Sequence, residues 1–195
     1  MKLLLGIAGS IAATLNKKIV DQIFEDVNPD ELFVYYTEAA LKIVNSKRDV
    51  LPWWYDKTCT YANRVFVVGE NDEWGSIQRD KVLHVDMGKL DLIVVAPATA
   101  NTIAKIAHGF ADNMLTSTIL VRGYERLIVA PAMNTGMYNN PITQKNIATI
   151  RSLGCSVVDP VSKLLYCGDE GIGALAPASE ITKQIKNHHA IYNRH

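Results

Sequence analysis

Cysteine is scarce in this sequence, and the few cysteines present form no metal or disulfide pattern. Cys59, Cys155 and Cys167 are the only three in 195 residues. Their number is odd, their spacing is wide, and the chain has no Cys-x-x-Cys pair and no Cys/His spacing typical of zinc. We therefore expect no metal site and a protein that stays reduced in the cytoplasm.

The sequence also lacks an excess of either charge and a long hydrophobic run. Its 20 Lys and Arg residues balance 20 Asp and Glu residues, so no overall field attracts nucleic acid or an anionic membrane. The apolar stretch at residues 92–98 is far shorter than the roughly 20 residues that a membrane span needs. We expect a soluble protein with a small-molecule substrate, no nucleic-acid or membrane partner, and only local sites for anions.

Short apolar runs of strand length recur along the chain, separated mostly by longer stretches with helical periodicity. The apolar runs lie at residues 3–8, 32–36, 64–68, 92–96, 127–130 and 156–158. The helical stretches lie at residues 11–26, 38–45, 101–108, 113–122, 143–153 and 178–187. Such alternation predicts an α/β fold in which a doubly wound parallel sheet carries helices on both faces. Without an internal repeat, a chain of this length is expected to form one domain over residues 1–195.

Two segments depart from this alternation. Residues 52–80 carry all three tryptophans, Trp53, Trp54 and Trp74, and a polar run, so we interpret them as a loop excursion near the active site. Residues 187–195 have only a weak pattern and are interpreted as a tail. The histidines of this tail are expected at the surface rather than as ligands.

The first predicted strand ends in a glycine-containing turn at residues 6–13, with the sequence GIAGSIAA. This turn lacks the Gly-x-Gly-x-x-Gly spacing of dinucleotide sites. Gly9 would allow the backbone to approach a ligand, and a helix beginning at Ser10 would offer N–H groups to a phosphate monoester. A plain strand-to-helix turn explains the same residues equally well. Thr37 follows the second strand and could add a hydroxyl, since the carboxyl ends of parallel strands share one edge.

Three further loops carry polar or reactive side chains. Thr99 and Asn101 follow the strand at residues 92–96 and suit either hydrogen bonds to a ligand or helix capping. Asn134 lies in a loop rich in Met and Asn, where it could cap a helix or help to hold a carboxylate beside a flat apolar ring. Cys167 begins a glycine-rich segment at residues 167–173 that we interpret as a mobile flap over a site, although most lone cysteines are inert.

Taken together and in this order, the motifs resemble those of the homo-oligomeric flavin-containing cysteine decarboxylases. The matching elements are GSIA at residues 9–12, His84, ATANT at residues 98–102, PAMNTGM at residues 131–137, and Cys167 in the CGDEGIG segment at residues 167–173. The resemblance covers nearly the whole chain. It implies a Rossmann-like, flavodoxin-like subunit that assembles as a trimer or a multiple of a trimer, with FMN at a subunit boundary.

The resemblance also assigns roles to individual residues. His84 matches the family's active-site histidine, Asn134 the residue that binds the substrate carboxylate, and Cys167 the thiol that donates a proton in the last step. Met137 is expected to contact substrate beside Asn134. The residues expected to bind FMN are Gly9, Ser10, Ile11, Thr37, Thr99, Ala100, Asn101, Thr102 and Ala132.

The activity that the resemblance implies is FMN-dependent decarboxylation of phosphopantothenoylcysteine to phosphopantetheine in coenzyme A biosynthesis. Peptide-modifying relatives stop at the enethiol and do not need the thiol at Cys167, so its presence favours the coenzyme A branch. The alternatives are a peptidyl-cysteine oxidative decarboxylase of ribosomal peptide maturation and a non-catalytic protein-phosphatase regulatory subunit of the halotolerance type. The latter proteins usually carry long acidic extensions, which this sequence lacks.

Overall fold

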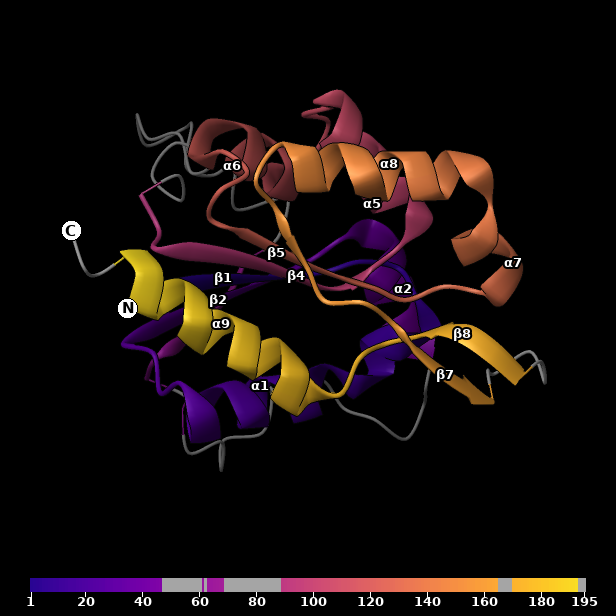
Figure 1. Ribbon diagram of the computed structural model, residues 1–195. Helices are drawn as coiled ribbons and strands as arrows, with labels where there is room; N and C mark the ends of the chain where they lie inside the picture. Colours follow the sequence, from indigo (N-terminus) through magenta and orange to yellow (C-terminus); the bar gives the residue numbers. More distant parts are fainter. Residues whose placement is uncertain (47–60, 62, 69–88, 165–169, 193–195) are drawn as a thin grey trace.

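A parallel six-stranded sheet organises the chain (Figure 1). The computed structural model describes residues 1–46, 61, 63–68, 89–164 and 170–192. The strands are β1 (Lys2–Ile7), β2 (Glu31–Tyr36), β3 (Val65–Val68), β4 (Leu92–Ala98), β5 (Leu127–Pro131) and β6 (Ser156–Val157), in the order β3-β2-β1-β4-β5-β6. Every neighbouring pair is parallel. The predicted doubly wound α/β fold is confirmed, with the strand order of a Rossmann-like sheet.

Helices cover both faces of this sheet (Figure 1). One face packs against the 3-10 helix η1 (Ile11–Leu15), α1 (Asn16–Asp26), α2 (Glu38–Ser46) and α9 (Ala178–Tyr192). The other face packs against α5 (Ala100–His108), α6 (Met114–Arg122), α7 (Thr135–Asn139) and α8 (Pro141–Ser152). Successive residues of β1 alternate between the two cores: Leu3 and Leu5 enter the first, and Leu4 enters the second. Apolar residues therefore run continuously along β1 because both of its faces are buried.

The carboxyl ends of the central strands are held side by side. The Thr37 N–H donates to the Ile7 carbonyl at 3.0 Å, and the Ala8 N–H donates to the Pro97 carbonyl at 3.0 Å. The loops that follow β1, β2 and β4 thus begin at one edge of the sheet. The order of connection reverses between β1 and β4, and such a switch point is where ligands bind in open α/β sheets.

Part of the predicted glycine-rich flap forms one strand of a β-hairpin. Strands β7 (Val161–Leu164) and β8 (Glu170–Ala174) pair antiparallel. A Cβ added at Gly173 would lie 2.3 Å from the Met133 carbonyl oxygen, and one added at Gly171 would lie 2.6 Å from Thr135 Oγ1. These two glycines therefore allow a paired strand to pack closely on a neighbouring loop, and the mobility of the segment stays a prediction.

The C-terminal helix α9 continues to Tyr192, past the predicted end at residue 187. Ile181, Ile185 and His188 form one buried stripe along it, with helical spacing. His188 is only 7% exposed and its Nε2 lies 3.0 Å from Ser156 Oγ, so the expectation that it lies at the surface is wrong. Burial lowers the pKa of His188, and the charge of Arg126 lowers it further. No helix in the described ranges is long and apolar enough to cross a membrane.

Candidate functional site

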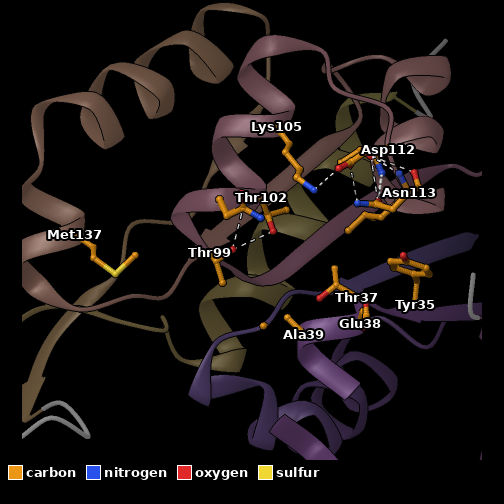
Figure 2. Close-up of a pocket in the computed structure, with 14 residues that line it drawn as sticks. Tyr35, Thr37, Glu38, Ala39, Thr99, Thr102, Lys105, Asp112, Asn113 and Met137 are labelled. Atoms are coloured by element: carbon orange, nitrogen blue, oxygen red, sulfur yellow. Dashed lines mark hydrogen bonds and ion pairs between the residues drawn. The ribbon is translucent and has the colours of Figure 1, made fainter. Parts of the chain in front are cut away.

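A cavity of about 680 Å³ opens at the carboxyl edge of the sheet, between the end of β2 and the helices α5 and α6 (Figure 2). Both sides of the switch point contribute to its wall. The residues expected from the sequence that line it are Gly9, Thr37, Thr99, Asn101, Thr102 and Met137. The structure therefore brings together residues from the loops after β1, β2 and β4, from α5 and from α7.

Three helices begin at this cavity, and the residue that caps each N-terminus lines its wall. Thr37 caps α2, Thr99 caps α5 and Asn113 caps α6. Each side-chain oxygen accepts a hydrogen bond from the backbone N–H three residues later, at 3.2, 3.2 and 3.0 Å respectively. Because the N-terminus of a helix carries partial positive charge, the three together favour an anion such as a phosphate in the cavity.

The turn after β1 packs against the start of α2. A Cβ added at Gly9 would lie 2.4 Å from the Cβ of Ala39, so glycine allows this turn to lie directly against the first turn of α2. Ser10 caps η1 and accepts a hydrogen bond from the Ala12 N–H at 3.3 Å. The plain-turn interpretation of this segment is thus consistent with the structure, while Gly9 also forms part of the cavity wall.

Five of the expected residues are not among the described residues that line the cavity: Ser10, Ile11, Ala100, Ala132 and Asn134. Ser10 and Ile11 directly follow Gly9, and Ala100 lies between Thr99 and Asn101. Ala132 is buried, and its N–H donates to the Ala98 carbonyl at 2.9 Å, joining the loops after β4 and β5. His84 and Cys167 lie outside the described residues.

The loop after β5 reaches the site through α7. Asn134 caps this short helix, since its Oδ1 accepts a hydrogen bond from the Gly136 N–H at 2.8 Å. One turn later Met137 lines the cavity and is 49% exposed. Behind the loop, the Met133 N–H donates to the Gly173 carbonyl at 2.9 Å, so strand β8 supports the segment that carries Asn134 and Met137.

Two ion pairs involve residues of the cavity wall. Lys105 Nζ lies 2.5 Å from Asp112 Oδ2, and Lys42 Nζ lies 2.6 Å from Glu38 Oε1. A hydrogen bond from Lys105 lowers the pKa of Asp112, and one from Lys42 lowers the pKa of Glu38. Both acids are therefore held as carboxylates, paired with a cation.

Sequence reasoning missed Lys105, Asp112 and Asn113 as site residues. Charged side chains on a helix and in the loop after it are normally solvated, and nothing local set these apart. A signal was available at Asn113, because an Asn three residues before Thr116 at the start of an apolar helix forms a capping box. An N-cap beside the carboxyl edge of a predicted parallel sheet is a candidate for anion binding.

Comparisons with known proteins agree with the predicted family. The family model described as Flavoprotein matches residues 1–189. Phosphopantothenoylcysteine decarboxylase from Oryza sativa subsp. japonica is 37% identical over 189 residues, which cover 95% of this chain and 79% of that protein.

Two solved structures are also similar. A mutant PPC decarboxylase complexed with pantothenoylaminoethenethiol superposes with a TM-score of 0.80 at 33% identity, over 95% of this chain and 96% of that one. The FMN binding protein AtHal3 gives a TM-score of 0.77 at 33% identity, over 95% and 94% of the two chains. The extent of these matches, together with the fold and the position of the cavity, shows that the chain belongs to the flavoprotein family, as one of its flavin-containing cysteine decarboxylases.

Proposed function

We propose that this protein binds FMN and decarboxylates phosphopantothenoylcysteine to phosphopantetheine, a step of coenzyme A biosynthesis. The observation that carries the proposal is the cavity at the switch point of the sheet, lined by the caps Thr37, Thr99 and Asn113 in a chain of this family. Relatives named for this activity match over nearly the whole chain. These matches favour a specific enzyme, a carboxy-lyase, over a general flavin carrier.

The residues of the cavity fit FMN. Its volume of about 680 Å³ lies within the range of cofactor pockets, and its three helix N-termini suit a phosphate monoester. In this proposal the phosphate binds near Gly9, Ser10, Ile11 and Thr37. The remaining flavin extends along residues 99–102 toward Ala132. When bound, FMN supplies a hydride acceptor, so the cysteine side chain can be oxidised and its carboxylate can leave as CO2.

Asn134 is proposed to hold the carboxylate that leaves. Its Oδ1 accepts a hydrogen bond from the Gly136 N–H, so the donor that a substrate carboxylate requires is Nδ2. A neutral amide orients the carboxylate without placing a full positive charge beside it, which would stabilise the ground state more than the transition state. Met137, one turn along α7, would contact the substrate beside it.

His84 and Cys167 are proposed to handle protons. His84 would act as a base or orient the substrate thiol, since imidazole titrates near neutral pH. Cys167 would donate a proton to the enethiol that remains after CO2 leaves, and the hydride that completes the saturated product would come back from the reduced flavin. The strands on both sides of Cys167 form the β7–β8 hairpin, and β8 is bonded to the loop that carries Asn134. Because β8 links these two segments, we expect Asn134 and Cys167 to act on the same substrate molecule.

Replacing Cys167 tests the assignment to coenzyme A biosynthesis. Cys167→Ser is expected to release CO2 from phosphopantothenoylcysteine but to accumulate the unsaturated enethiol, measured by mass spectrometry under anaerobic conditions. Cys59→Ser, at a cysteine with no proposed role, should form phosphopantetheine as the unchanged protein does. Full conversion to phosphopantetheine by Cys167→Ser would contradict the assignment and leave the peptidyl-cysteine reaction as the better candidate.

We also propose that the protein assembles as a homotrimer or a multiple of one. Helix α6 buries one side in the core, yet Leu120 and Val121 on its other side are 48% and 52% exposed. Phe110, in the connection that leads to α6, is 58% exposed. A helix apolar on both sides and next to the cavity is well suited to contact a second copy of the chain. A cytoplasmic location stays a prediction.

A further inference from the structure

The cavity wall contains a charged pair whose role the proposed chemistry does not use. Lys105 and Asp112 both line the cavity and point toward one another (Figure 2). Their side chains are 27% and 49% exposed. Lys105 follows Thr99 and Thr102 at intervals of three residues, so the three share the face of α5 that lines the cavity. Asp112 directly precedes Asn113, the cap of α6. The pair therefore joins the last turn of α5 to the residue before the N-terminal cap of α6, at the cavity wall.

The charges around the cavity indicate that Lys105 affects the affinity for any anionic ligand. Lys105 is the one cation among the lining residues that the structure describes, and Glu38 and Asp112 are the acids. Glu38 is joined to Lys42, which lies outside the lining. A phosphate monoester bound near Gly9 and Thr37 would share the cavity with the carboxylate of Asp112, and the ammonium of Lys105 offsets the repulsion between these two negative charges.

We propose that Lys105, by offsetting the charge of Asp112, makes the cavity select flavin carrying a phosphate monoester over uncharged riboflavin. This inference rests on the proposed binding of FMN and adds to it the residue that determines specificity. Asp112 has the opposite effect, because its carboxylate limits the affinity for an anion and holds the ammonium in place at 2.5 Å. Removing Lys105 should then weaken the preference for FMN over riboflavin, and removing Asp112 should strengthen it.

Titrating flavin-free protein with FMN and with riboflavin tests this directly. Lys105→Met leaves Asp112 unpaired, so the Kd for FMN should rise about tenfold while the Kd for riboflavin changes little. Asp112→Asn should lower the Kd for FMN relative to riboflavin. The double variant Lys105→Met/Asp112→Asn should return the ratio of the two values close to its original level. Both shifts should shrink at high salt, because the pair is partly exposed.

Lys17→Met is a matched control. It removes a lysine from a pair with Asp21 at 2.6 Å on α1, and the ratio of the two Kd values should stay unchanged. The helix content of each flavin-free protein is checked before the titration, which separates misfolding from altered selectivity.

The outcomes distinguish this inference from the proposed function. If Lys105→Met weakens FMN and riboflavin equally, or if both single variants shift the ratio in the same direction, the pair only ties α5 to α6 and the inference is wrong. If the unchanged protein binds no FMN, the proposed function itself fails. FMN binding by the unchanged protein, with opposite shifts in the two single variants, supports both.

Discussion

At the scale of single residues, Gly173 joins the β7–β8 hairpin to the loop that carries Asn134. Its φ is +141°, and a Cβ would lie 2.3 Å from the Met133 carbonyl oxygen, a backbone atom that cannot rotate away. We expect Gly173→Ala to lower the free energy of unfolding by about 1–3 kcal/mol, measured by urea denaturation, because the strand must move away from the loop. Decarboxylation should fall as well, since the same loop positions Asn134 and Met137.

Gly123→Ala separates backbone strain from this clash. Gly123 also has a positive φ, +87°, but no atom lies within 4 Å of an added Cβ. Gly123→Ala should therefore cost only the backbone strain of an alanine at φ +87° and ψ 170°, a region open mainly to glycine, about 1–3 kcal/mol, and leave the decarboxylation rate unchanged. Equal losses of stability and activity in the two variants would show that close packing of β8 does not matter.

The residues that could be predicted at this scale are those whose type and local position match a motif. Thr37 and Thr99 follow apolar runs at positions where a cap or a ligand contact is expected, and both line the cavity. Lys105 and Asp112 carry no such signal, because their meeting depends on how α5 and the start of α6 come together. The same holds for His188, whose burial follows from the packing of α9 rather than from its neighbours in sequence.

At the scale of elements, helix caps serve both stability and the site. The side chain of Asn113 forms a capping box with Thr116 at the start of α6 and lines the cavity. Asn113→Ala should destabilise the fold by about 1 kcal/mol and also weaken FMN binding, measured by thermal unfolding and by flavin titration.

Asn140→Ala is the matched control for the cap of α6. Asn140 caps α8, its Oδ1 accepting from the Ile142 N–H at 2.9 Å, and it is not among the described residues of the cavity wall. This variant should lose similar stability but keep its affinity for FMN. If both variants bind FMN equally well, Asn113 is a structural cap only.

The elements themselves could be predicted to different degrees. All six strands of the sheet coincide with apolar runs in the sequence. In the central strands β1, β4 and β5 the apolar run follows from burial on both faces, whereas the edge strand β3 is exposed at Phe66 and Val67. The helix expected over residues 11–26 divides into η1 and α1. Helix α7 is too short for its periodicity to be recognised, and β8 contains two glycines that favour a loop when taken alone. Tertiary contacts define both elements.

At the scale of the whole molecule, the exposed apolar side of α6 predicts association. Leu120→Glu/Val121→Glu should reduce the mass measured by light scattering from about three times the 21.6 kDa chain, or a multiple of that, toward a single chain, because two buried charges cannot be accommodated in an apolar interface.

Leu153→Glu serves as the control for this test. Leu153 is 43% exposed after α8, at a surface for which no contact is proposed, and the variant should keep the mass of the unchanged protein. A single-chain mass for the unchanged protein, or an unaltered assembly in the α6 variant, would contradict an interface at this helix.

The most direct test of the account is to incubate the purified protein anaerobically with phosphopantothenoylcysteine, after recording its visible spectrum, and to follow the products by mass. A yellow protein that yields CO2 and phosphopantetheine is the expected result, since the fold, the cavity and the family all favour an FMN-dependent decarboxylase. A yellow protein that leaves this substrate unchanged would contradict the assigned substrate, and a protein that neither contains nor takes up flavin would contradict the account as a whole.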